Sequence, residues 1–232
     1  MKQRALIFGS SGTIGSCIHK DLISKDYDIY TAGKSNRKNQ ENHINIDYSL
    51  ELESKFFKNL PTLDVVIWSH GLNCSDTVEN FKVKNLSEII NSNVIFIASC
   101  ISNLLNEGKL REGARLLIIS SIWQIECRKN KFSYSVSKSA LQGLIKSAAI
   151  DLGCKNILIN GILPGVIDSP MTRMHLTEEQ INKVTTETAL GRLPTGKDIA
   201  MASNFLISPL NKSITGQFII VDGGFLGLKN NL

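Results

Sequence analysis

Short apolar runs alternate along this chain with segments whose apolar residues recur at helical spacing. Such runs, bounded by turn residues, are typical of buried strands, and their alternation with helices predicts a parallel sheet covered on both faces. The connections between the strands should be right-handed. The expected strands are residues 4–8, 27–31, 43–47, 63–68, 114–119, 156–163 and 217–221. The pattern therefore predicts an α/β fold, with one doubly wound, seven-stranded parallel sheet in a single domain over residues 1–232.

A glycine-rich stretch follows the first expected strand. Glycines at positions 9, 12 and 15 precede a helical pattern that continues through Ile18 and Leu22. Glycines let a backbone approach a pyrophosphate closely, and a helix N-terminus offers free N–H groups and a positive dipole end. A glycine pattern can also be only a tight turn, but its place between a strand and a helix favours dinucleotide binding.

The end of the second expected strand bears on the choice of cofactor. Chains specific for NAD usually carry Asp or Glu there to bind the ribose hydroxyls, whereas this chain has Gly33 followed by Lys34. Lys34, Arg37 or Lys38 can pair with a 2′-phosphate. The sequence therefore favours NADP(H) over NAD(H). The alternative is a solvated basic loop and an enzyme that accepts either cofactor.

Tyr134 and Lys138 stand four residues apart in a segment with helical spacing, so their side chains share one helix face. A free tyrosine has a pKa near ~10, and a neighbouring ammonium should lower it and make the phenol a usable acid or base. The same spacing is common on exposed helices. Ser121, two residues after the end of a buried strand candidate, favours the catalytic interpretation.

Several further motifs follow in order. They are Asn91-Ser92-Asn93-Val94, the stretch from Asn160 to Met171, Gly191-Arg192-Leu193, Asp198-Ile199-Ala200, Thr215-Gly216-Gln217 and Val221-Asp222-Gly223-Gly224-Phe225. With the glycine loop and the spacing of Ser121, Tyr134 and Lys138, this series resembles the short-chain dehydrogenase/reductase family, in particular its 3-oxoacyl-ACP reductase-like members. The resemblance covers essentially the whole chain and implies a Rossmann fold that binds NAD(P).

The resemblance also implies a role for each matching residue. Asn93, Ser121, Tyr134 and Lys138 would form the catalytic set, in which Asn93 interrupts its helix and holds a water that links the lysine to solvent. The implied cofactor contacts are Gly9, Ser11, Gly12, Thr13, Ile14, Lys34, Asp47, Tyr48, Ser69, Gly71, Tyr134, Lys138, Pro164, Ile167 and Ser169. Residues from about 169 to 190 would form a mobile lid over the substrate.

Three assignments keep a second interpretation. Asp47 is expected to contact adenine, but its place before residues 49–57 also suits a helix cap. His70 stands where relatives carry a small residue, and it is either a cofactor contact that titrates near neutrality or a hydrogen-bonded core histidine. Arg173, in the expected lid, is either a partner for an anionic substrate or a solvent-exposed arginine.

The expected activity is the interconversion of a carbonyl compound and a secondary alcohol by hydride transfer, with Tyr134 as general acid/base. The glycine spacing differs from that of most short family members and resembles the branch that modifies nucleotide sugars. That departure leaves an epimerase or dehydratase as an alternative, beside a non-catalytic NADP(H)-binding sensor. The substrate and the direction of the reaction stay open.

Composition narrows the remaining classes. The net charge is +5, but no aromatic-interleaved basic stripe indicates nucleic acid binding. The first apolar run, residues 5–8, is too short for a secretory signal or a membrane span, so a cytoplasmic protein is expected. The five scattered cysteines favour reduced thiols over disulfides or a metal site. By analogy with the family, the chain should form a homotetramer or a homodimer.

Overall fold

The computed structural model describes residues 2–34, 42–48 and 54–227. One parallel sheet holds all the strands, in the order β3-β2-β1-β4-β5-β6-β7. The strands are β1 (Arg4–Phe8), β2 (Asp28–Gly33), β3 (His43–Asn45), β4 (Leu63–Trp68), β5 (Leu110–Ile119), β6 (Leu158–Pro164) and β7 (Phe218–Val221). This order reverses between β1 and β4, which is where doubly wound sheets bind their ligands. The predicted fold class is confirmed.

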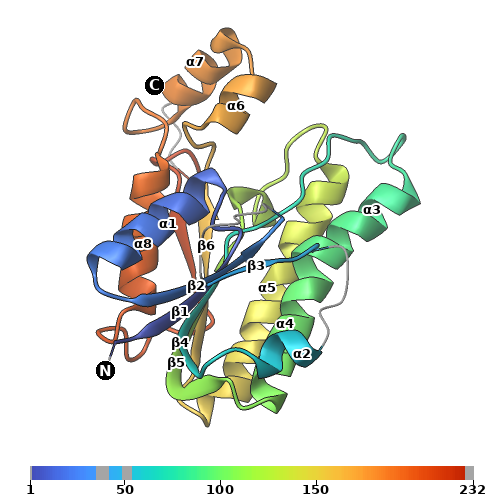
Figure 1. Cartoon of the computed structure of the whole chain (residues 1–232). Coiled ribbons are helices and arrows are strands. Elements are labelled where there is room, and N and C mark those ends of the chain that lie inside the picture. Colours follow the sequence, from blue (N-terminus) through green and yellow to red (C-terminus); the bar gives the residue numbers. More distant parts are fainter. Residues whose placement is uncertain (1, 35–41, 49–53, 228–232) are drawn as a thin grey trace.

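Helices cover both faces of the sheet. In Figure 1, α1 and α8 lie on one face, and α3, α4 and α5 lie on the other. The helices are α1 (Thr13–Ser24), α2 (Ser54–Lys58), α3 (Val83–Ile90), α4 (Phe96–Asn106), α5 (Phe132–Gly153), α6 (Pro170–His175), α7 (Glu178–Glu187) and α8 (Gly196–Ile207). The strands most deeply enclosed, β4 and β6, are buried along their whole length, as expected for a sheet covered on both faces.

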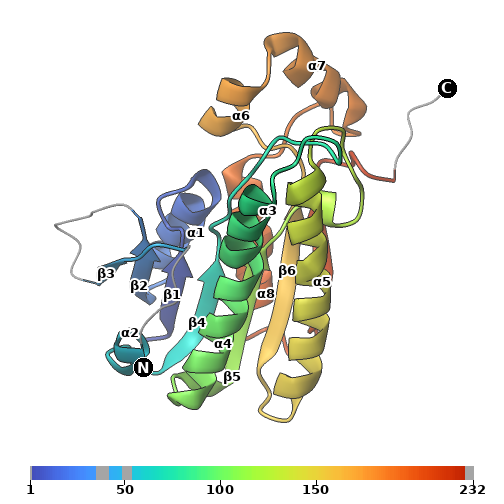
Figure 2. The ribbon, with the colours of Figure 1, turned by 90° about the vertical axis from the view of Figure 1, so that its right-hand side faces the viewer.

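Two segments refine the sequence-based expectation. The helix that contains Asn93 is interrupted, as the family resemblance implies, because a π-helical segment (Asn91–Ile95) separates α3 from α4. The expected lid contains two helices, α6 and α7. The hydroxyl of Ser169 caps α6 and the hydroxyl of Thr177 caps α7, and each accepts a backbone N–H of its helix. Figure 2 shows α6 and α7 standing beyond the end of the sheet.

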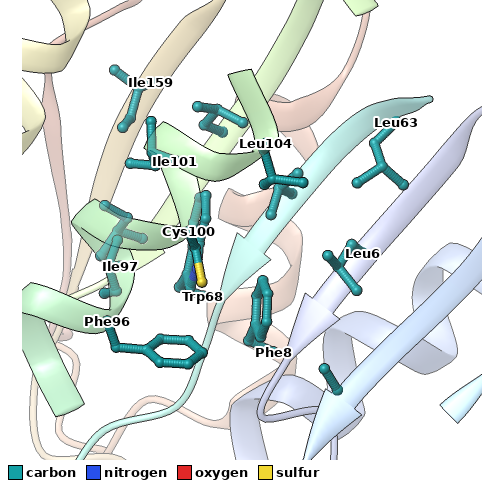
Figure 3. Packing of buried hydrophobic residues seen from close by; sticks show 14 of the residues in the cluster. Leu6, Phe8, Leu63, Trp68, Phe96, Ile97, Cys100, Ile101, Leu104 and Ile159 are labelled. Atoms are coloured by element: carbon teal, nitrogen blue, oxygen red, sulfur yellow. The ribbon is translucent and has the colours of Figure 1, made fainter. Parts of the chain in front are cut away.

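The larger of the two cores lies between the sheet and α4 and α5. Phe8 of β1 stacks on Trp68 of β4, with ring centroids 5.8 Å apart, and meets the edge of Phe96 of α4 at 5.6 Å. Figure 3 shows these rings beside Ile97 and Cys100 of the same helix. This packing fixes the ends of β1 and β4 relative to α4, and therefore relative to the π-helical segment that precedes it.

The run Val83–Asn106 passes, by length and composition alone, a test for a membrane-spanning helix, with a mean hydropathy of 1.4. In the structure this run contains the π-helical segment and buries Ile97, Cys100 and Leu104 against the sheet. Core helices of globular domains pass the same test, so the run is weak evidence for a membrane span. All five cysteines are free thiols, of which Cys100 is buried and Cys127 and Cys154 are exposed.

Candidate active site

The site is built where the strands end. Ser69 follows β4, Ser121 follows β5, and Pro164 is the last residue of β6. Because neighbouring parallel strands end at one edge of the sheet, these residues lie along the same edge as the glycine loop that follows β1. Tyr134 and Lys138 reach the site from the first turns of α5, which packs against the 3-10 helix Ile122–Gln124 that follows Ser121.

The predicted catalytic side chains come together. Ser121 is buried and caps the 3-10 helix, because its Oγ accepts the N–H of Trp123 at 3.3 Å. Lys138 is also buried, and its Nζ donates to the carbonyl oxygen of Ile119 at 3.2 Å. The same Nζ lies 5.7 Å from the ring centroid of the half-buried Tyr134. The Lys138 ammonium has two further donors with which to bind a ligand.

The pKa values differ from the sequence-based expectation. Burial raises the pKa of Tyr134 to about 12, against the opposite effect of its hydrogen bond with Ser121. Burial also lowers the pKa of Lys138 to about 8. The expected lowering of the tyrosine pKa is therefore wrong for this arrangement, since desolvation of the phenolate outweighs the hydrogen bond with Ser121. At neutral pH the phenol keeps its proton and is a donor.

Asn93 lies in the π-helical segment and is fully bonded. Its Oδ1 accepts the N–H of Leu72 at 2.8 Å, and its Nδ2 donates to the carbonyl of Leu72 at 3.0 Å and to Ser137 Oγ at 3.1 Å. A Cβ atom on Gly71 would lie 3.5 Å from Lys138 Nζ and 3.6 Å from Asn93 Oδ1. The helix is thus irregular at Asn93, and the asparagine joins the chain after β4 to α5.

The glycine loop has the geometry of a close turn. Gly9 has a φ of +78°, and a Cβ atom there would lie 2.7 Å from the backbone nitrogen of His70. A Cβ atom on Gly15 would overlap the carbonyl oxygen of Gly9. Gly12 is the N-cap of α1, and no side chain accepts a hydrogen bond there and no acidic residue occupies the first turn. Ser11, Thr13 and Ile14 flank this open helix N-terminus, which suits a pyrophosphate.

The residues expected near the adenosine end contact one another. Lys34 Nζ pairs with Asp47 Oδ1 at 3.0 Å, and both side chains are about half exposed. The predicted phosphate partner and the predicted adenine contact therefore share an ion pair. Arg37 and Lys38 lie outside the described residues. Tyr48 is buried and donates its hydroxyl to the carbonyl of Ala32 at 3.0 Å.

His70 is a core histidine. Its ring stacks on Tyr48 with centroids 4.0 Å apart and planes 4° apart, and its Nε2 lies 3.0 Å from the carbonyl oxygen of Ser92. Since a carbonyl only accepts, Nε2 carries the proton. Burial lowers the pKa of His70 to about 3. The ring is therefore neutral at physiological pH, which favours the interpretation of His70 as a hydrogen-bonded core histidine over a cofactor contact that titrates near neutrality. Beside it, Ser69 Oγ donates to the carbonyl of Phe8 at 2.7 Å and ties β4 to β1.

The segment after β6 is organised by a residue that sequence reasoning missed. Thr172 donates its N–H to Ser169 Oγ at 3.1 Å and its hydroxyl to the carbonyl of Ile167 at 2.6 Å. Both of the cofactor contacts expected after Pro164 are thus held by α6. Arg173 pairs with Asp168 at 2.8 Å. The spacing of Ser169, Pro170 and Thr172, a capping pattern at a helix start, is a signal that points to this role.

Two other contacts near the site were also missed. Trp123 meets Phe225 edge to face, with ring centroids 6.3 Å apart, which places the C-terminal stretch beside Ser121. Lys131 Nζ lies 6.0 Å from the ring centroid of Tyr134, on the opposite side in sequence from Lys138. The first contact joins segments about 100 residues apart, and Lys131, although only three residues before Tyr134, belongs to no recognisable local motif.

Comparisons with known proteins agree with this geometry. A family model described as enoyl-(acyl carrier protein) reductase matches residues 51–226. The 3-oxoacyl-(acyl-carrier-protein) reductase FabG of Chlamydia muridarum is 33% identical over 171 residues, which cover 73% of this chain and 68% of that protein. The 3alpha-hydroxysteroid dehydrogenase of Mediterraneibacter gnavus is 31% identical over 161 residues, 69% of this chain and 64% of that protein.

Solved structures give the same fold. ElxO with NADP bound has a TM-score of 0.87 at 24% identity and covers 98% of this chain and 100% of its own. The 4-hydroxyisoleucine dehydrogenase complexed with NADH has a TM-score of 0.89 at 22% identity, with the same coverage. At this identity the likeness concerns the fold alone.

Proposed function

Because this chain belongs to the short-chain dehydrogenase/reductase family, we propose that it is an NADP(H)-dependent oxidoreductase that interconverts a carbonyl compound and a secondary alcohol by hydride transfer. The convergence of Ser121, Tyr134 and Lys138 at the carboxyl edge of the sheet is the observation that carries the proposal. The bound cofactor supplies the hydride.

The chain's own residues manage the proton and the substrate oxygen. Ser121 donates a hydrogen bond to the carbonyl oxygen, and Tyr134 gives that oxygen its proton as negative charge develops there. Lys138, held by the carbonyl of Ile119, supports the phenolate that remains and binds the nicotinamide ribose. Asn93 provides the route by which a proton returns to Lys138, and reoxidation of the alcohol reverses these steps.

The cofactor is assigned to the carboxyl edge of the sheet, from the glycine loop after β1 to the end of β6. The uncapped N-terminus of α1 suits the pyrophosphate, and Gly71, Pro164, Ile167 and Ser169 suit the nicotinamide side. Gly33 in place of a carboxylate, followed by Lys34, favours NADP(H). Since Asp47 now holds Lys34, a 2′-phosphate must compete for this cation or join the pair.

The proposal also includes a substrate lid, a cellular location and an oligomeric state. Helices α6 and α7 act as a lid over the substrate. The protein is cytoplasmic and assembles into a homotetramer or homodimer, a state supported by exposed apolar side chains on α5 and α8, namely Val136, Ile150, Met201 and Phe205. Multi-angle light scattering of the purified protein measures the assembly, and a monomer would refute it.

Titration of the protein with NADPH and NADH, followed by a panel of ketones, tests the activity. The panel contains a 3-oxoacyl thioester, a 3-oxosteroid and keto sugars. Stoichiometric oxidation of NADPH supports a reductase. Conversion of a nucleotide sugar with no net oxidation supports the epimerase or dehydratase suggested by glycines 9, 12 and 15, and tight binding without turnover supports a sensor.

Tyr134→Phe should lower turnover by roughly 10²–10⁴-fold and leave NADPH binding nearly unchanged, since it removes only the proton donor. Tyr27→Phe, which removes a half-buried phenol far from the site, is the control and should keep wild-type turnover. Because the pKa of Lys138 is about 8, kcat/KM should fall as the pH rises above that value. Full turnover by Tyr134→Phe would refute the mechanism.

A further inference from the structure

The catalytic helix begins without a cap of its own. Helix α5 starts at Phe132, and the side chain of its N-cap residue, Lys131, accepts no hydrogen bond from the first turn. The first four N–H groups of an α-helix have no partner within the helix, and an end at which they find none frays. Tyr134 lies in this first turn, so any fraying would move the phenol directly.

Asp76, from the loop between β4 and α3, supplies the missing partner. Its backbone carbonyl accepts the N–H of Phe132 at 3.2 Å, and its Oδ1 accepts the N–H of Ser133 at 2.9 Å. The Ser133 hydroxyl donates to the same carboxylate. Asp76 is only 6% exposed. Burial alone would raise its pKa, but these hydrogen bonds from Ser133 hold the pKa below its usual value.

Lys131, at the start of α5, also binds the loop that contains Asp76. Its Nζ donates to Asn73 Oδ1 at 2.9 Å, to Ser75 Oγ at 3.1 Å and to the carbonyl of Cys74 at 3.3 Å. All three donors of the ammonium are therefore used on three consecutive residues of the loop. Its charge remains close to the tyrosine ring, at 6.0 Å from the centroid.

The loop also holds the other catalytic element. Leu72, at the start of this stretch, exchanges two hydrogen bonds with Asn93 of the π-helical segment. Residues 72–76 thus join Asn93 to the first turn of α5. We propose that Asp76 is a positioning residue, which acts through the start of α5 to hold Tyr134 in register with Asn93 and Ser121. This inference rests on the proposed function, because its main readout is turnover.

The test compares Asp76→Ala with Asp198→Ala. Asp198 also satisfies a backbone N–H at a helix start, that of Thr195, but it lies on α8 and outside the machinery described above. Both variants lose a cap and some stability. With enzyme counted by its NADPH-binding sites, Asp76→Ala should lower kcat about 10- to 100-fold, since a small displacement of a reacting group has effects of that size. Its NADPH Kd and substrate KM should stay within about threefold, and Asp198→Ala should keep wild-type kcat.

Asp76→Asn is the conservative variant, since an amide oxygen can still accept the N–H of Ser133. It should recover most but not all of the lost kcat, because its NH2 group cannot accept the Ser133 hydroxyl. If Asp76→Ala does not fold, this partial loss of kcat, absent in Asp198→Ala, is the expected result, and wild-type kcat in Asp76→Asn would overturn the proposal. Wild-type kcat in folded Asp76→Ala, or an equal loss in Asp198→Ala, would overturn the proposal and leave Asp76 as a purely structural cap.

A second readout does not depend on activity. In protein labelled with ¹³C-tyrosine, the Tyr134 resonance is assigned by its absence in Tyr134→Phe. It should shift in Asp76→Ala and stay in place in Asp198→Ala. If the wild-type protein turns over no carbonyl compound, the proposed function fails while this shift still supports the positioning role. An unmoved Tyr134 resonance would refute that role whatever the activity.

Discussion

Helices α1 and α8 lie side by side on one face of the sheet, yet their N-termini are finished in opposite ways (Figure 1). Helix α8 has a complete capping box, in which Thr195 Oγ1 accepts the N–H of Asp198 at 3.3 Å and Asp198 Oδ2 accepts the N–H of Thr195 at 2.7 Å. Arg192 pairs with the same carboxylate. Helix α1 begins at Gly12 with no side-chain cap.

The difference separates an end built for stability from an end left open for a ligand. A capped terminus satisfies its N–H groups within the chain. An acidic residue in the first turn further stabilises the helix, because its negative charge lies at the positive end of the helix dipole. The same cap at α1 would repel a pyrophosphate and occupy the N–H groups that should bind it. The chain can build a cap, as α8 and α7 show, so its omission at α1 is consistent with binding at that end.

Gly12→Asp would remove the difference and should have the largest effect. Gly12 has extended backbone angles, and the nearest atom to an added Cβ is the Gly9 carbonyl oxygen at 3.5 Å, so a side chain fits. The variant should keep its stability and lose about 100-fold in NADPH affinity, since a hydrogen bond to a charged group is worth about 1.5–3 kcal/mol. Nicotinamide fluorescence measures the Kd.

Gly12→Ser is the matched control, because serine caps a helix without a charge. Its affinity loss should be clearly smaller than that of Gly12→Asp. If both variants lose NADPH affinity equally, the added side chain acts by its size and not by its charge. If Gly12→Asp keeps wild-type affinity, the pyrophosphate does not bind at this helix end.

Asp198→Asn tests the closed end and should have a moderate effect on stability alone. The amide oxygen can still accept the Thr195 N–H, but the variant loses the charge that pairs with Arg192 and favours a helix N-terminus, which should cost about 0.2–1 kcal/mol because the side chain is 34% exposed. Arg192 and the Thr195 backbone lower the pKa of Asp198 to about 2 from 3.8. The stabilisation is therefore present above pH 4 and is lost as the pH falls through 2.

Chemical denaturation of both proteins from pH 7 to pH 2 measures this difference. The two stabilities should differ by a constant amount at pH 5–7 and converge at the acid end. A reduced NADPH affinity in Asp198→Asn would contradict the division of roles between the two helices.

Asp47→Asn, at the proposed adenosine end of the cofactor site, should have the smallest effect. The change releases Lys34 from its ion pair, and exposed pairs contribute about 0.2–1 kcal/mol. NADPH should therefore bind up to about fivefold more tightly relative to NADH. The ratio of the two Kd values is the measurement, since any adenine contact of Asp47 acts equally on both cofactors. An unchanged ratio in Asp47→Asn, with a lowered one in Lys34→Met, would show that Asp47 does not compete.

The fold was predictable because its signals are local. Apolar runs and glycine turns located every strand, and the strands that differ do so at their ends. Residues 110–113 were missed as the start of β5 because Arg111, Glu112 and Gly113 are not apolar. The division of the helix at Asn93 was stated on the family resemblance, since an asparagine by itself does not predict a π-helical turn.

The positions of the site residues were predictable from the sequence, but their burial, pKa values and supporting contacts were less so. Ser121, Tyr134 and Lys138 were placed together by their spacing, but the raised pKa of Tyr134 depends on burial, which no spacing reveals. Asp76 and Lys131 were missed for a similar reason. Their hydrogen-bond partners lie about 57 positions away in the sequence, and the start of α5 carries no capping motif that would point to them. The ion pair of Lys34 with Asp47 likewise joins two strands.

The π-helical segment carries one residue more than an α-helix of the same course would need. Each α-helical residue advances by about 100° around the axis, so deleting one residue there would rotate α4 against α3 by that angle. Either Phe96 and Cys100 would leave the core, or Asn93 would leave Leu72. An insertion of this kind is easily acquired and hard to lose, because a descendant that drops it must rebuild a core and an active site in the same step.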